Sequence, residues 1–158
     1  MRSARDRCVG RYTLDTLQLV DKFTLKKNPP YAIDISGNEL YVYEYDIALK
    51  IFNLNTKVLI RQWSTPTRTA AIKIHGGNLY YVGFGNGIIY IYNLSGGLIK
   101  QFGKGGSGNG EFSGPYGIDV DEKFIYIADS YNFRIQVFHL NNCTYSHQWE
   151  SRKWRWTI

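Results

Sequence analysis

The sequence predicts an all-β fold, a partial β-propeller of about three and a half four-stranded blades. The 158 residues include 13 Tyr, 8 Phe, 4 Trp and 16 Gly, and aromatic rings with glycine-rich turns favour strands over helices. Short apolar segments recur at an interval near forty residues, and no segment carries a long helical stripe. A lone blade cannot cover both of its faces, so repetition around an axis has to supply neighbours.

The chain begins halfway through a blade. Residues 12–16 and 22–23 align with residues 52–56 and 62–63, which belong to the outer two strands of the next unit. Residues 10–28 are therefore predicted to form an outer strand pair whose two inner strands are absent. A basic segment, residues 1–9, precedes this half blade.

Three complete blades follow, because four apolar blocks recur in three successive units. The blocks are 32–35, 40–42, 50–54 and 62–63; then 71–74, 79–81, 90–94 and 101–102; then 117–120, 125–127, 136–140 and 148–149. We predict blades at 29–64, 65–103 and 104–150, the last lengthened by a glycine-rich stretch. The strand alternation predicts core positions at Ile33, Ile35, Ile72, Ile74, Ile118 and Val120.

The repeat stops after Trp149, and the basic tail, residues 151–158, supplies no further blade. Three and a half blades do not close a ring. Three interpretations stay open: the chain is a fragment, it is a truncated product without retained function, or two chains form a homodimer that completes the ring.

The third unit carries a specific pattern. It reads Pro115-x-Gly117-Ile118-x-Val120, then Ile125-Tyr126-Ile127-Ala128-Asp129, then Asn132-x-Arg134-Ile135-Gln136-Val137-Phe138. With its glycine-rich lead-in at 103–112, this unit resembles an NHL repeat. Phe133 stands where the family has the His of its name, and the Asp129 position is Glu44 and Gly83 in the other units. The resemblance implies NHL-like blades and a family of protein-interaction and RNA-binding modules with lyase and hydrolase relatives.

The net charge of +6 comes from the ends of the chain. Residues 1–11 and 151–158 each contribute +3, and the body between them is neutral. Phosphate affinity depends on many cations acting together, so we expect any RNA binding to be weak and carried by the ends. The N-terminus lacks the apolar stretch of a signal peptide, and no apolar run is long enough for a bilayer. We therefore expect a soluble cytoplasmic protein that does not enter membranes.

No motif predicts catalysis, a cofactor or a metal. The stretch 103–108 matches G-x-G-x-x-G, but a strand rather than a helix follows it, which favours an inter-blade loop over a phosphate site. Cys8 and Cys143 lack metal-ligand spacing, and the three histidines do not converge in sequence. We expect no enzyme activity.

Two sets of residues are candidate contacts. Asp34, Lys73 and Asp119 share one position of the innermost strand in successive units and are candidate axial polar residues, with ion pairing between blades preferred over cation binding. The candidate rim contacts are Tyr43, Tyr45, Phe84, Tyr131 and Arg134. Their rings could stack on bases, although rings in a propeller are more often wedged between blades.

The function that these observations favour is a non-catalytic scaffold that binds a protein partner, with RNA as a weaker second ligand. The alternatives are a fragment of a propeller enzyme of the lyase or lactone-hydrolase kind, or a truncated product without retained function. An enzyme would need metal ligands from several blades at the mouth of the axis.

Overall fold

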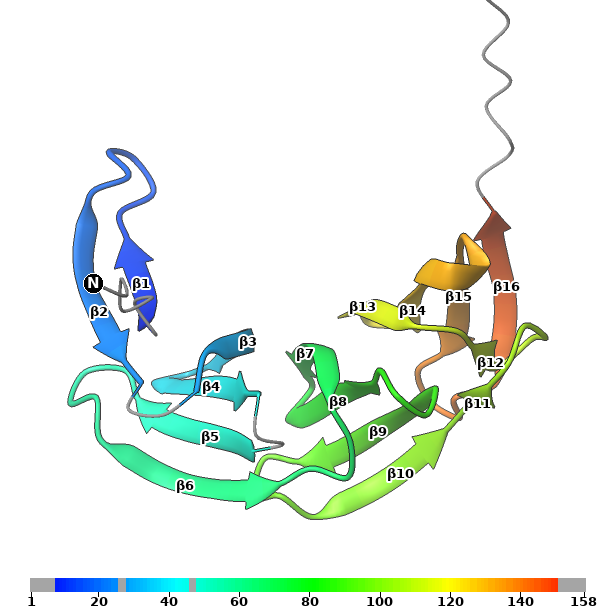
Figure 1. Ribbon diagram of the computed structural model, residues 1–158, viewed down its shortest axis with the longest axis horizontal. Coiled ribbons are helices and arrows are strands. Elements are labelled where there is room, and N and C mark those ends of the chain that lie inside the picture. Colours follow the sequence, from blue (N-terminus) through cyan, green and yellow to red (C-terminus); the bar gives the residue numbers. More distant parts are fainter. Residues whose placement is uncertain (1–7, 26–27, 46–47, 151–158) are drawn as a thin grey trace, which may run out of the picture. The chain divides into compact units, whose positions relative to one another are not determined.

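The computed structural model describes residues 8–25, 28–45 and 48–150, and it divides into two compact units at Thr65. Figure 1 shows that both units are built from strands that follow one another in chain order, and neighbouring strands within each four-stranded sheet are antiparallel. The described residues contain no α-helix. The all-β prediction and the four-stranded blades are confirmed.

The first unit holds a strand pair and one four-stranded sheet. The pair is β1 (Cys8–Tyr12) with β2 (Leu19–Thr24), and the sheet is β3 (Pro30–Ser36), β4 (Glu39–Glu44), β5 (Ala48–Asn53) and β6 (Leu59–Ser64), in that order. The core of this unit joins the pair to the sheet, because Phe23 and Leu25 pack against Leu40 and Val42.

The second unit holds two four-stranded sheets. The first is β7 (Thr69–His75), β8 (Asn78–Gly83), β9 (Ile88–Asn93) and β10 (Leu98–Phe102). The last sheet is β13 (Pro115–Val120), β14 (Phe124–Asp129), β15 (Arg134–His139) and β16 (Tyr145–Glu150), with the 3-10 turn η1 (Ser130–Asn132) after β14. Between them, β11 (Lys104–Gly105) pairs in parallel with β12 (Glu111–Phe112).

The turns follow from local chemistry. Gly76 and Gly77 have φ of +55° and +74° between β7 and β8, which only glycine adopts at low cost and which matches the twist of a tight hairpin. Between β13 and β14, the Asp121 carboxylate accepts hydrogen bonds from the N–H groups of Lys123 and Phe124, both at 2.8 Å. Each turn reverses the chain within a few residues and leads directly into the next strand of the sheet.

The core of the second unit lies between its two sheets. Tyr80, Val82, Ile89 and Ile91 of the first sheet form one cluster with residues of the last sheet and of its neighbourhood. These are Val120, Ile125, Ile127 and Phe138 of the last sheet, Cys143 of the β15–β16 turn, and Phe112 of β12. Strand β13 packs against β7 and β8. Strands of one blade thus cover the inner strand of the next, as the repeat requires.

The core prediction is wrong at two residues. Val120 is buried, but Ile33 and Ile35 are 47% and 52% exposed. In the second unit, β7 and β8 are the inner strands that cover β13. The half blade made by β1 and β2 has no inner strands among the described residues, so nothing equivalent covers β3.

Candidate functional site

A buried carboxylate ties the glycine-rich lead-in to the last sheet. Asp129 is fully buried at the end of β14. Its carboxylate accepts hydrogen bonds from Ser113 N at 2.7 Å, Arg134 Nε at 2.8 Å and Asn132 Nδ2 at 2.9 Å. Gln136 Nε2 is a fourth donor, at 3.1 Å. A buried charge needs such compensation.

Arg134 extends the same network toward the lead-in. Its Nη2 atom donates to the carbonyl oxygens of Gly108 at 2.7 Å and Glu111 at 3.0 Å, and its Nη1 donates to Gln148 Oε1 at 3.0 Å. The Arg134 side chain is only 7% exposed. It therefore holds the loop to the sheet and is not an exposed rim contact.

The residues that correspond to Asp129 in the other two units make different contacts. In the first, Glu44 is buried and pairs with Lys50 Nζ at 2.6 Å. In the second, the position is Gly83, and a Cβ there would lie 2.6 Å from the Ile88 carbonyl oxygen. Among the described residues, this network is found in the third repeat.

Residues of the G-x-G-x-x-G stretch bind the side chain of Glu111, which follows the stretch in sequence. The Glu111 carboxylate accepts the N–H groups of Gly108 at 2.9 Å and Ser107 at 3.1 Å, and Lys104 Nζ lies 3.0 Å from it. The Gly108 hydrogen bond, followed by Lys104, lowers the pKa of Glu111. The Glu111 carboxylate thus accepts the backbone donors of this loop and pairs with its lysine.

The axial candidates are placed in both units. Lys73 Nζ lies 2.9 Å from Asp119 Oδ1, which joins β7 to β13. This hydrogen bond lowers the pKa of Asp119. Asp34 lies in the first unit, where its carboxylate accepts the N–H of Ile35 at 2.8 Å. The Lys73 contact is an ion pair between neighbouring sheets of the second unit.

The candidate rim residues differ in how far their side chains are exposed. Tyr43 is 1% exposed and so does not contribute to a surface, whereas Tyr45 is 42% exposed and packs on Tyr31 with ring centroids 5.4 Å apart. In the second unit, Phe84 and Tyr131 lie 6.4 Å apart between ring centroids. The structure brings these two together.

Tyr116 completes an aromatic cluster with Phe84 and Tyr131. Its ring centroid is 4.9 Å from that of Phe84, in an edge-to-face arrangement. Tyr116 and Tyr131 are 53% and 62% exposed. Sequence reasoning missed Tyr116, although its place beside Pro115 at the start of β13 was an available signal. We call Phe84, Tyr116 and Tyr131 the aromatic cluster.

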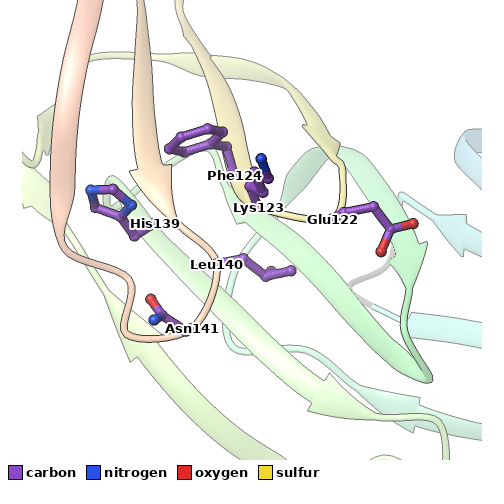
Figure 2. Close-up of a pocket in the computed structure, with 6 residues that line it drawn as sticks. All are labelled: Glu122, Lys123, Phe124, His139, Leu140 and Asn141. Atoms are coloured by element: carbon purple, nitrogen blue, oxygen red, sulfur yellow. The ribbon is translucent and has the colours of Figure 1, made fainter.

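A shallow pocket lies at the turn end of the last sheet. Figure 2 shows its lining, Glu122, Lys123 and Phe124 from the β13–β14 turn and His139, Leu140 and Asn141 from the end of β15. The rings of Phe124 and His139 are 5.4 Å apart. Its titratable lining residues are Glu122, Lys123 and His139. The lining contains no Ser, Thr or Cys that could act as a nucleophile beside the histidine.

The described residues were also searched for metal and membrane features. Among residues 8–25, 28–45 and 48–150, no group of three or more His, Cys, Asp or Glu side chains is placed to hold a metal ion. Within the same ranges, no helix has the length and apolar character needed to cross a bilayer. The basic ends, residues 1–7 and 151–158, lie outside the described residues.

A solved structure has a fold similar to that of this chain. The computationally designed Ika8 protein, known from a crystal structure, is similar to it with a TM-score of 0.66 over 93% of this chain, at 13% sequence identity. The matched region is 44% of the Ika8 chain, so this chain spans less than half of that protein's length. The sheets of both units are those of a partial β-propeller.

The third unit identifies the repeat. Residues 112–138 match the family model of the NHL repeat, which covers the end of the lead-in, β13, β14 and most of β15. The third unit therefore contains an NHL repeat, within a chain whose sheets form a partial propeller. Comparison with curated proteins found no match.

Proposed function

We propose that this chain is a non-catalytic scaffold that binds a protein partner through the aromatic cluster. The observation that carries the proposal is the exposure of Tyr116 and Tyr131, at 53% and 62%, beside a partly buried Phe84. Exposed tyrosines offer a large contact area at low conformational cost, and they are enriched in protein interfaces.

The cluster is built on restrained backbone, which favours binding. The N–H of Phe84 donates to the Arg68 carbonyl at 2.9 Å, and that of Tyr131 donates to the Ser113 carbonyl at 3.0 Å. Ser113 also donates to Asp129, so the Asp129 network supports the segment under Tyr131. A backbone held in this way loses little conformational freedom when a partner binds.

Peptides selected from a random display library on the whole chain provide the test. Combined Tyr116→Ala and Tyr131→Ala substitution should weaken the best peptides by about tenfold or more, measured by fluorescence anisotropy. The matched control is Tyr12→Ala, because Tyr12 is 57% exposed but lies in the first unit; its affinity should stay unchanged. Peptides that bind the double variant as well as the native chain would refute the proposal.

RNA enters the test as a competing ligand. The same variants should be measured with a mixed single-stranded RNA pool at physiological salt, because stacking on tyrosines would also serve bases. We expect weak, salt-sensitive binding that the double substitution does not change. Tight binding that the substitution abolishes would make the cluster an RNA site and overturn the assignment of a protein partner.

Self-association is the second part of the proposal. Tyr126 of β14 and Trp149 of β16 stack with ring centroids 5.9 Å apart, and Trp149 is 52% exposed. We propose that this aromatic pair supports a homodimer in the cytoplasm, because exposed apolar surface favours association between chains. Light scattering should report a dimer that Trp149→Ser weakens; a monomer throughout the micromolar range would contradict it.

A further inference from the structure

The aromatic cluster lies where the two complete four-stranded sheets of the second unit meet. Phe84 follows β8 of the first sheet, whereas Tyr116 at the start of β13 and Tyr131 in η1 belong to the last sheet. The Phe84 ring meets the two tyrosine rings edge to face, at interplanar angles of 66° and 75°. Rings inclined in this way form a corner, so they do not offer one flat platform on which planar bases stack in a row.

Gly114 fixes the position of the Tyr131 ring. A Cβ at Gly114 would lie 2.7 Å from Cδ2 and Cε2 of that ring, so the ring packs directly on the backbone of residue 114. Gly114 also has a φ of +53°, which glycine adopts without strain. The Tyr131 ring is therefore already placed before a ligand arrives.

The backbone beneath the cluster has no free donor for an incoming strand. The N–H groups of Phe84 and Tyr131 already donate to the carbonyl groups of Arg68 and Ser113. Strand addition needs such groups unpaired. The polar groups that the exposed rings themselves carry are the two phenol hydroxyls, which can donate to carbonyl groups of a ligand.

The charges tied to the cluster disfavour a cationic ligand. The carboxylate joined to the cluster through Ser113 belongs to Asp129, which is fully buried and already accepts four hydrogen bonds. Arg68, whose carbonyl group binds the Phe84 N–H, is an exposed cation. A methylated ammonium group on these rings would thus reach no carboxylate and would have a like charge nearby. A neutral ligand rich in carbonyl groups suits the cluster better.

We infer that the aromatic cluster binds a proline-rich peptide in the polyproline II conformation. Such a helix has no internal hydrogen bonds, so its carbonyl oxygens face outward, where phenol hydroxyls can donate to them. Proline has no N–H group and therefore asks for no acceptor. Its rings pack on aromatic side chains, and the preformed helix loses little entropy on binding. This inference rests on the proposed function and names the chemistry of the partner.

The probe is a dye-labelled decaproline peptide, and its fluorescence anisotropy is measured against the full chain. We expect saturable binding that weakens by about tenfold or more in the Tyr116→Ala and Tyr131→Ala double variant. A flexible glycine–serine peptide of the same length should not bind. Tyr12→Ala is the matched control, because Tyr12 is 57% exposed in the first unit; its affinity should stay within about twofold of the native value.

Two milder changes separate the hydroxyls from the rings. The Tyr116→Phe and Tyr131→Phe double variant keeps the rings and removes the donors, so it should bind decaproline about threefold or more weakly. Gly114→Ala displaces the Tyr131 ring and should weaken binding by a similar factor, about threefold. Gly37→Ala is its control, because residue 37 has a similar φ of +55° but open space around the new Cβ. Circular dichroism shows that each variant is folded.

The inference is overturned if decaproline does not bind, or if the phenylalanine double variant binds it as tightly as the native chain. It is equally overturned if Gly114→Ala has no more effect than Gly37→Ala, or if a trimethyl-lysine peptide binds through the same tyrosines more tightly than decaproline. Library-selected peptides that need the tyrosines, lack proline and are not displaced by decaproline would refute this inference and leave the proposed function standing. Library peptides that ignore the tyrosines would refute the proposed function itself, so the two failures are separable.

Discussion

Replacing Asp129 with alanine tests whether the buried carboxylate holds the third repeat together. The substitution removes the acceptor of four hydrogen bonds, from Ser113, Asn132, Arg134 and Gln136. It also leaves the Arg134 guanidinium, 7% exposed, without its counter-charge. The local consequence should be loss of the attachment between the lead-in and the sheet.

The expected magnitude follows from what Arg134 retains. Removing one partner of a buried ion pair typically costs about 3 to 5 kcal/mol. Arg134 keeps three neutral acceptors, the carbonyls of Gly108 and Glu111 and the side chain of Gln148. We therefore expect about 3 kcal/mol, at the lower end of that range. In the Asp129→Ala and Arg134→Met double variant, the total cost should be less than the sum of the single costs by about 1 kcal/mol or more.

Native-state hydrogen exchange in increasing urea measures this cost where it arises, at the amides of β14 and β15. Asp119→Ala is the control, because Asp119 is 71% exposed and its pair with Lys73 lies at the surface; it should cost less than about 1 kcal/mol. An Asp129→Ala cost no larger than the control, or single costs that simply add, would refute the reasoning.

Three further predictions concern the turns, the pH and the repeat. Gly103→Ala should lower the free energy of unfolding in urea by more than about 2 kcal/mol, because the new Cβ would lie 2.6 Å from the Phe112 ring at a residue with φ of +87°. Gly37→Ala is the control: its Cβ would meet open space at φ of +55°, so it should lower the free energy of unfolding by only about 1 kcal/mol. Burial and a hydrogen bond to the Glu39 carboxylate raise the pKa of Tyr41 to about 12. Between pH 10 and 12 the folded state therefore keeps a proton that the unfolded state loses, so the free energy of unfolding should fall as the pH rises. The urea midpoint of the Tyr41→Phe variant should fall less over the same pH range. Val120→Ala should cost about 2 kcal/mol and Ile35→Ala less than about 0.5 kcal/mol by the same assay; equal costs would contradict the missing cover over β3.

Much of the fold was predictable because strand formation here is local. Alternating apolar residues and glycine turns recur unit by unit, and the strands form where the blocks predicted them, from the half blade at β1 and β2 to the last sheet. The NHL pattern of the third unit was legible for the same reason: Asp129, Asn132 and Arg134 lie within six residues of chain, so their spacing is visible before folding.

Exposure was not predictable in this way, because it depends on which sheet lies against which. Ile35 and Val120 occupy the same repeat position and read alike in sequence, yet one is 52% exposed and the other 6%. Tyr43 and Arg134 looked like surface residues and are buried, whereas Tyr116 went unnoticed until β13 and the β8–β9 turn were seen side by side.

The sequence by itself determined the strands, their order and the repeat, because these depend on neighbours a few residues apart. Only the tertiary structure decided which side chains stay exposed, namely the isoleucines of β3 and the tyrosines of the aromatic cluster. Burial is a property of the contact between sheets, and a residue pattern that repeats cannot record whether its neighbouring blade is complete.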